Sequence, residues 1–483
     1  MADTGVGAIL NDVHSALNPT RVARVVRPDS TEDVIAAVRL AATEGRAVSV
    51  AGSRHSMGGQ QFAADGVHLD MRGMTAINSL DADHGIVDVE AGIEWHELID
   101  GLQAMQTGRP EAWGIRQKQT GSDGLSLGGA LSSDVHGRGL VQRPIVEDVD
   151  GFTLVDAEGQ IRIVDRASDP ERFGLVIGGY GLFGVITSVR LRLAPRRILR
   201  REVAIVAVDE LMPAFEARIK VGSVFGDFQF SIDERSPDFL RQGILSCYTP
   251  EPAASSIPDG QRALSTDDWK KLLYLTHVDR AAAAQAYIAH YSATSGQLYW
   301  SDLHQRSEYV GAYHAYLDVA IGAAIPGTEI ITEIYVPRPA LAAFMVRASD
   351  ALRGGDPPVV YGTIRLVERD DEAVLAWARE PWACIIFNLH TNTDATGLMN
   401  VADTFRKLID LAIDHGGSYY LTYHRFATRE QLETCHPRFQ EFLESKRRLD
   451  PSERFQSDWY RHHREMFGLK ALSPPPAARP VAG

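Results

Sequence analysis

Three short segments rich in glycine and serine lie within the first 191 residues, and they constrain the fold more than any other feature. They read SVAGSRHSMGGQQF (49–62), QTGSDGLSLGGALSSDVHGRGL (119–140) and VIGGYGLFGVITSVRL (176–191). Loops of small residues let the backbone approach a ligand closely, and their N–H groups can bind phosphate oxygens. The first segment lacks G-x-G-x-x-G and G-x-x-x-x-G-K-[ST], which argues against Rossmann and P-loop sites. The three segments together predict a site for a large, flat ligand.

Two histidines lie inside these loops, and each has two interpretations. His55 is either a ligand-binding residue or a surface histidine bonded to backbone. His136, flanked by Asp134 and Gly137, lies either beside the ligand or in a tight turn that it stabilises.

Local sequence signals place the loops between regular elements. Residues 21–52 have the pattern of strand, turn, helix and strand, in which Ser30 or Thr31 caps the helix. Residues 149–165 alternate as a hairpin, and the strand after 184 should bury Val189, Leu191 and Leu193.

The pattern of predicted secondary-structure elements changes near residue 195 and again near residue 420. Short strands predominate before 195, whereas longer helices and wide strands follow. We predict an α+β protein in which residues 1–195 bind the ligand and residues 196–420 form a substrate domain, with a mixed or antiparallel sheet covered by helices. The charged segment 421–470 should return to the first domain, and the Pro/Ala-rich residues 471–483 should be disordered.

Charge and cysteine content exclude several classes of protein. The formal charge of -14 argues against nucleic acid as a partner. Three dispersed cysteines fit neither a disulfide framework nor a zinc site, and we expect no metal. The N-terminus has no signal-peptide pattern, and no apolar run of about 18 residues follows, so we expect a cytoplasmic protein without stable membrane insertion.

The loops resemble the FAD domain of the vanillyl-alcohol-oxidase family, which has the PCMH-type FAD fold. The resemblance covers residues 20–195 and includes VVRPDSTEDVIAAV, AGSRHS, SLGGALSSDVHG and GLFGVITSVRLRL. It implies FAD as cofactor, and a histidyl bond to the flavin at His55. No cysteine lies between Gln119 and Leu127, so a second, cysteinyl link is not expected. The implied cofactor-binding residues are Gly52, Ser53, Arg54, His55, Ser56, Met57, Gly58, Thr120, Gly121, Ser122, Gly128, Gly129, Ser132, Ser133, His136, Gly137, Gly184, Val185 and Ile186.

Two branches of this family are similar to different parts of the chain. The decaprenylphosphoryl-ribose oxidases are similar in DVHG and in residues 416–458, whereas the alditol and sugar-lactone oxidases share the histidyl loop and the strand in YGTIRLVERDDEAVLAWA (361–378). Residues 200–310 resemble neither branch. The ribose oxidases carry serine at the position of His55, which is a departure.

The resemblance also implies catalytic residues in the second domain. Arg365 matches a basic residue that faces substrate, although it could instead pair with Glu368 or Asp370 at the surface. The alditol branch has a glutamate where this chain has Thr363, so another group must accept the hydroxyl proton. We favour His390 over Glu333, although His390 could simply cap a strand. Tyr423 and His424 are the next candidates.

The expected function is oxidation of a hydroxyl group of a small polyol, sugar or aldonolactone, with O₂ or another acceptor reoxidising the flavin. One alternative is oxidation of a lipid-linked sugar, which the C-terminal resemblance suggests. Another is a flavin-binding protein without oxidase turnover. The oligomeric state does not follow from the sequence.

Overall fold

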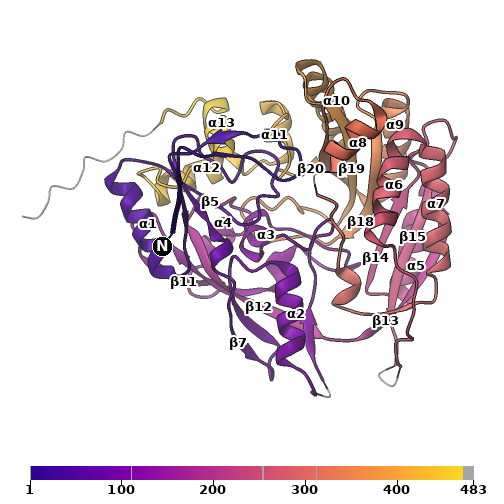
Figure 1. Ribbon diagram of the computed structural model, residues 1–483, viewed down its shortest axis with the longest axis horizontal. Helices are drawn as coiled ribbons and strands as arrows, with labels where there is room; N and C mark the ends of the chain where they lie inside the picture. The colour runs from indigo at the N-terminus through magenta and orange to yellow at the C-terminus, as the bar shows by residue number, and fades with distance from the viewer. Residues whose placement is uncertain (1, 110, 253–254, 312, 472–483) are drawn as a thin grey trace, which may run out of the picture.

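The computed structural model of the protein describes residues 2–109, 111–252, 255–311 and 313–471. Two lobes lie side by side, one built from the N-terminal part of the chain and the other from its middle (Figure 1). The α+β class predicted from the sequence is confirmed.

A four-stranded sheet carries the first loop. Its order is β1-β4-β6-β5, and β4 and β5 both run parallel to β6. The predicted helix packs on this sheet, and Ser30 is its N-cap because the side chain accepts a hydrogen bond from the Asp33 N–H group. The elements are β1 (Ala2–Val6), β4 (Arg24–Arg27), α1 (Thr31–Thr43), β5 (Val48–Ala51), β6 (Val67–Asp70) and η1 (Met71–Gly73), with β2 (Ile9–Leu10) and β3 (Thr20–Arg21) paired separately.

A six-stranded antiparallel sheet carries the other two loops. Its order is β11-β10-β12-β8-β7, and β9 also pairs with β12. The predicted hairpin is β10 and β11, and β12 buries Val189, Leu191 and Leu193 while Arg190 and Arg192 are exposed. The elements are β7 (Ile77–Asp81), β8 (Ile86–Glu90), α2 (Trp95–Met105), β9 (Trp113–Ile115), α3 (Leu127–Ser133), η2 (Ile145–Asp148), β10 (Val149–Val155), β11 (Ile161–Asp165), α4 (Pro170–Val176) and β12 (Val185–Pro195).

The second lobe is an eight-stranded sheet in which every pair of neighbouring strands is antiparallel. Its order is β16-β13-β15-β14-β18-β19-β17-β20. Its strands are β13 (Ile198–Ala207), β14 (Phe225–Phe230), β15 (Gln242–Pro250), β16 (Leu298–Trp300), β17 (Gly327–Pro337), β18 (Val359–Val367), β19 (Trp382–Asn392) and β20 (Ser418–Tyr419). Its helices are α5 (Val208–Lys220), α6 (Thr266–Val278), α7 (Arg280–Ala293), η3 (Leu303–Gln305), α8 (Tyr313–Ile321), η4 (Arg338–Ala340), α9 (Leu341–Leu352) and α10 (Ala395–Asp414).

The two faces of this sheet have different neighbours. Ile334, Ile364 and Ile385 point to the face that packs on α5, α9 and α10, where they join the main hydrophobic core. Side chains of a strand alternate between faces, so Glu333 and Arg365 point to the opposite face. There, α6, α7 and α8 cover part of the sheet, and the rest faces the first lobe.

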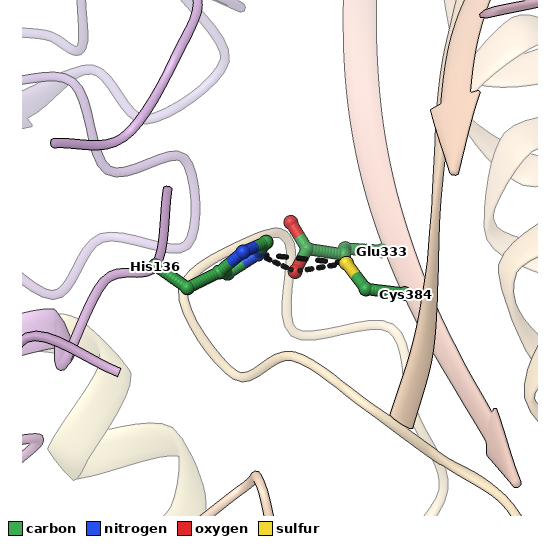
Figure 2. Close-up of side chains that lie close together, drawn as sticks. All are labelled: His136, Glu333 and Cys384. Atoms are coloured by element: carbon green, nitrogen blue, oxygen red, sulfur yellow. Dashed lines mark hydrogen bonds and ion pairs between the residues drawn. The ribbon is translucent and has the colours of Figure 1, made fainter. Parts of the chain in front are cut away.

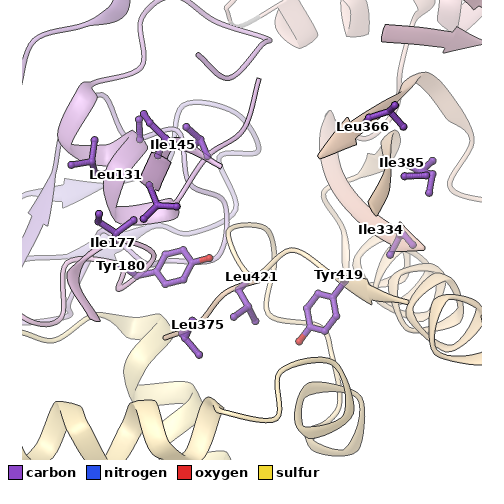
Figure 3. Close-up of a cluster of buried hydrophobic side chains, with 14 of the residues drawn as sticks. Leu131, Ile145, Ile177, Tyr180, Ile334, Leu366, Leu375, Ile385, Tyr419 and Leu421 are labelled. Atoms are coloured by element: carbon purple, nitrogen blue, oxygen red, sulfur yellow. The ribbon is translucent and has the colours of Figure 1, made fainter. Parts of the chain in front are cut away.

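The C-terminal segment returns to the first lobe, as Figure 1 shows in yellow. Its helices are α11 (Arg429–Cys435), α12 (Phe439–Leu449) and α13 (Asp458–Met466). Phe442 packs edge-on against Phe183, and Trp459 packs on Tyr180. Figure 3 shows buried side chains of the first lobe facing those of the sheet, with Leu421 between them, so one core joins both lobes. Of the predicted disordered tail, residues 472–483 lie outside the described residues.

Candidate active site

A cavity of about 1590 Å³, part of it open to solvent, separates the first lobe from the sheet of the second. All three glycine-rich segments contribute to one wall, and β17, β18 and β19 contribute to the other. The predicted cofactor-binding residues that line it are Gly52, Ser53, Arg54, His55, Ser56, Met57, Thr120, Gly121, Ser122, Gly128, Gly129, Ser132, Ser133, His136, Gly184 and Ile186.

The first loop requires glycine where it approaches the second. A Cβ atom on Gly52 would lie 1.8 Å from the Ser126 hydroxyl oxygen. Arg54 adopts the left-handed backbone conformation, with φ 61°. The Met57 N–H of this loop donates to the carbonyl of Thr422, which belongs to the C-terminal segment. The C-terminal segment therefore helps to shape this loop.

The second loop is organised around a buried lysine. The Lys118 ammonium donates to the Gln119 and Ser122 carbonyls at 2.9 and 3.2 Å and pairs with Asp123 at 3.0 Å. Burial lowers the pKa of Lys118 to about 8, although Asp123 opposes that shift. The three contacts hold the backbone of residues 119–123 at the cavity wall.

The third loop turns at glycines into β12. Gly184 has φ 148°, and a Cβ atom there would lie 2.7 Å from the Val155 carbonyl oxygen. Gly179, Gly181 and Gly184 do have the spacing G-x-G-x-x-G, but they precede a strand rather than a helix. This context is not that of a dinucleotide-binding Rossmann turn.

Glu333, in the opposite wall, is the centre of a buried hydrogen-bond cluster that His136 joins from the glycine-rich wall (Figure 2). Its Oε1 accepts from His136 Nε2 at 2.7 Å, from the Tyr335 hydroxyl at 2.7 Å and from the Cys384 thiol at 3.1 Å. Among the residues that the structure describes, its Oε2 accepts only from the Tyr423 hydroxyl, at 3.2 Å. Burial would raise the pKa of Glu333, but the His136 ring and these donors outweigh it and lower the pKa to about 2. Glu333 is therefore a carboxylate at neutral pH.

The same cluster has the spacing of a metal site. One ligand atom each from His136, Glu333 and Cys384 lies within 4.8 Å of the others. Burial and the Glu333 charge raise the pKa of the Cys384 thiol well above its usual value, so Cys384 is a thiol that donates to Glu333. The mutual hydrogen bonds explain the cluster without an ion.

Arg365 lies in the cavity wall with 6% of its surface exposed. Its guanidinium donates to the Thr120 hydroxyl, and its Nε has no hydrogen-bond partner in the described part of the chain. The alternative partners are engaged elsewhere, because Glu368 pairs with Arg338 and Asp370 accepts backbone N–H groups. Among the described residues, no carboxylate lies within ion-pair distance of Arg365, so this buried cation is available to a ligand.

Several predicted residues lie outside the cavity. His390, the favoured proton acceptor, contacts the rings of His277 and His314, and its cross-strand partner Glu329 is four residues from Glu333 on β17. His424 bonds to the Ser15 hydroxyl at 3.2 Å and stacks on Phe426. Both rings therefore lack the contact with the cavity that catalysis would require. The residues predicted to contact FAD that do not line the cavity are Gly58, Gly137 and Val185.

The cavity also contains residues that the sequence did not suggest. His14, Tyr361, Asn388 and Tyr420 line it. Tyr361 lies on β18, four residues before Arg365, and Asn388 is its cross-strand partner on β19. Side chains alternate along these strands, so the alternation could have identified both residues as facing the cavity. Nothing in the local sequence identifies His14, which comes from an irregular segment between β2 and β3.

The glycine-rich wall fits FAD. Several polar atoms of cavity residues are buried and have no hydrogen-bond partner within the described ranges of the chain: Arg54 Nε, Gln61 Oε1, Gln119 Nε2 and Arg365 Nε. Buried polar atoms in folded proteins are nearly always bonded, so these atoms indicate a polar ligand. Arg54 supplies positive charge beside the loops, which suits a pyrophosphate.

Comparison with known proteins agrees with this assignment. Residues 22–165 match the family described as FAD binding domain. The chain is 33% identical over 169 residues to an uncharacterized oxidoreductase in the fasciation locus of Rhodococcoides fascians, and the alignment covers 35% of this chain and 37% of that protein. It is 29% identical over 177 residues to the decaprenylphosphoryl-β-D-ribose oxidase of Mycolicibacterium smegmatis, covering 36% and 37%. It is 31% identical over 159 residues to cytokinin dehydrogenase 3 of Oryza sativa subsp. japonica, covering 31% and 29%.

The chain therefore carries an FAD-binding domain of the PCMH type, and the predicted cofactor FAD is confirmed. Each alignment spans little more than a third of the relative, or less. No described helix is long and apolar enough to cross a lipid bilayer.

Proposed function

We propose that this protein is an FAD-dependent oxidoreductase that oxidises a hydroxyl group of a small polyol, sugar or aldonolactone. The observation that carries the proposal is the juxtaposition, across one cavity, of an FAD-binding wall and a second wall. That second wall bears an ionised Glu333 and an Arg365 that has no carboxylate partner among the described residues. A protein that only stores flavin has no need of two opposite charges buried in such a cavity, since each is costly to desolvate.

Oxidation of an alcohol removes a proton from oxygen and a hydride from carbon. FAD, when bound, supplies the two-electron acceptor. Glu333 Oε2 has a single partner among the described residues, and it is the atom that accepts the hydroxyl proton. Its low pKa makes it a weak base but keeps it ionised, and Tyr423 orients it. Arg365 and Asn388 hold the remaining polar groups of the substrate, and Arg365 stabilises negative charge that develops in the reaction.

A lipid-linked sugar is the second candidate substrate, and one observation favours it. A buried Arg365 without a carboxylate partner in the described part of the chain suits an anionic group such as the phosphate that links a sugar to a lipid. A relative named decaprenylphosphoryl-β-D-ribose oxidase matches part of the chain.

Anaerobic flavin reduction tests the proposal. We expect the bound flavin to bleach when at least one compound is added from a panel of sorbitol, glucose, gluconolactone and a prenylphosphate-linked pentose. Bleaching only by the last compound would select the second candidate. A flavin that stays oxidised with every compound, while dithionite still reduces it, would contradict oxidation of hydroxyl groups.

We further propose that FAD is attached covalently to His55. Acid precipitation of the holoprotein should leave a yellow pellet, and the intact mass should exceed the 53.0 kDa chain by one FAD. His55→Ala should bind FAD without a covalent bond and should keep its melting temperature, because one partly exposed loop side chain contributes little to the core. A colourless pellet from fully loaded wild-type protein would contradict covalent attachment.

A further inference from the structure

A groove beside the active-site cavity, which we call the α7 groove, lies between α7 and strands β13, β14, β15 and β18. Its volume is about 920 Å³, part of it open to solvent. On the sheet side, the cavity is lined by β17, β18 and β19. Tyr361 of β18 lines both the cavity and the α7 groove, so the two spaces adjoin at this residue.

Strand pairing places the floor of the α7 groove on the face of the sheet that carries Arg365. Gln229 of β14 is the cross-strand partner of Thr363 on β18, and Ile244 of β15 is in turn the partner of Gln229. Side chains alternate along a strand, so Thr363 shares its face with Tyr361 and Arg365. Helix α7 covers the part of this face that β13 and β15 form. The α7 groove therefore extends the same face that lines the cavity.

The Tyr361 hydroxyl is available to a ligand at the point where the two spaces adjoin. Among the described residues, none makes a hydrogen bond with this hydroxyl. Burial and the nearby Asp227 raise the pKa of Tyr361 to about 12, although the Arg365 guanidinium opposes that shift. Tyr361 is therefore a neutral phenol at pH 7, and its hydroxyl can both donate and accept.

The lining of the α7 groove combines unbonded amides with aromatic rings. The side-chain amides of Gln229, Gln242 and Gln285 make no hydrogen bonds within the described part of the chain. An amide both donates and accepts, which suits a sugar hydroxyl. Tyr287 and Tyr361 supply rings for the apolar faces of a sugar. No described lysine, arginine or histidine lines the α7 groove, so an anionic substituent would have no cationic partner there.

We propose that the α7 groove binds the non-reacting unit of a neutral disaccharide, whose other unit is oxidised in the cavity. This inference rests on the proposed oxidation of a sugar hydroxyl. Glu333 accepts the proton from the reacting unit, and the glutamine amides hold the distant unit. Tyr361 bonds to the linkage between the two units. Contacts with the distant unit contribute binding energy remote from the reacting bond, which favours the longer substrate over a single sugar.

Calorimetric binding to the Glu333→Gln holoprotein tests this inference without turnover, because the amide cannot accept the hydroxyl proton. We expect at least one of cellobiose, maltose and lactose to bind about tenfold or more tightly than glucose. In the same background, Gln229→Leu/Gln285→Leu should remove this advantage, because the change deletes two amides and keeps their bulk. Ala284→Trp should also remove it by filling the α7 groove. Gln160→Leu is the matched control and should keep it, since that exposed side chain lines neither space.

Three disaccharides that bind no more tightly than glucose would overturn the inference, as would an advantage that survives in both groove variants or an equal loss in Gln160→Leu. In the wild-type holoprotein, the disaccharide that binds best should bleach the flavin anaerobically with a higher kcat/KM than glucose. Bleaching by glucose alone would show that the α7 groove is not a substrate subsite. The same assay separates the two proposals, because glucose that bleaches the flavin without any disaccharide advantage leaves the oxidoreductase proposal intact.

Discussion

Glu333→Gln is expected to slow single-turnover flavin reduction by about 10²–10⁴-fold, the range that general acid–base groups contribute. The amide has the shape of the carboxylate but cannot take the hydroxyl proton. In the wild type, a histidine acceptor would make kcat/KM fall as the pH drops through about 6.5, the ordinary histidine pKa. With Glu333 as the acceptor, kcat/KM should fall only below pH 4.5, the ordinary carboxyl pKa. Stopped-flow absorbance at several pH values measures both effects.

Glu329→Gln is the matched control for this variant. Glu329 lies on the same face of β17 outside the cavity, where burial raises its pKa to about 8, so it is neutral at pH 7 and its amide changes little. Reduction in Glu333→Gln at the wild-type rate would show that Glu333 is not the proton acceptor.

The charge of Glu333 also predicts how stability depends on pH. A carboxyl whose pKa is lowered in the folded state contributes stability above its unfolded value, and this contribution is lost as the pH falls from about 4.5 toward about 2. Glu333→Gln should flatten the dependence of unfolding free energy on pH in that window. Equal slopes for wild type and variant in urea titrations would show that the His136–Glu333 pair contributes nothing to folding.

Arg365→Ala should lower kcat/KM about a hundredfold or more, which corresponds to roughly 2.7 kcal/mol of transition-state stabilisation. The guanidinium is buried in the cavity wall without a carboxylate partner among the described residues, so its removal breaks no ion pair of the fold. The melting temperature should therefore change little, and steady-state kinetics with thermal unfolding measures both.

Arg338→Ala is a suitable comparison, because Arg338 pairs with Glu368 at 2.7 Å and does not line the cavity. We expect that variant to keep its kcat/KM. Loss of folding in Arg365→Ala with unchanged activity per folded molecule would show a structural role for Arg365 instead.

Local sequence patterns were sufficient for the elements of the first lobe. Residue periodicity and capping predicted α1, the β10–β11 hairpin and the buried face of β12, because these depend on neighbours in the chain. Side chains alternate along β18, so Arg365 lies on the opposite face of the sheet from Ile364 and Leu366. The position of the boundary at residue 195 stays a prediction, although β12 ends at Pro195 and β13 begins at Ile198.

The choice among the candidate proton acceptors required the tertiary structure. The sequence favoured His390 over Glu333. The distance of each residue from the first lobe follows from the pairing of β17 with β19 and from the helices that cover one end of the sheet. His14 illustrates the same limit, since its contact with His55 joins residues 41 apart through a loop without periodicity.

The sequence by itself determined the α+β class and the glycine-rich loops that line the cavity, because these depend on local periodicity and on backbone freedom. The tertiary structure alone decided that Glu333 accepts four hydrogen bonds, that Arg365 has no carboxylate partner among the described residues and that His14 faces His55. These properties arise when segments far apart in the chain are buried against one another. Burial then leaves each group with only the partners that packing provides.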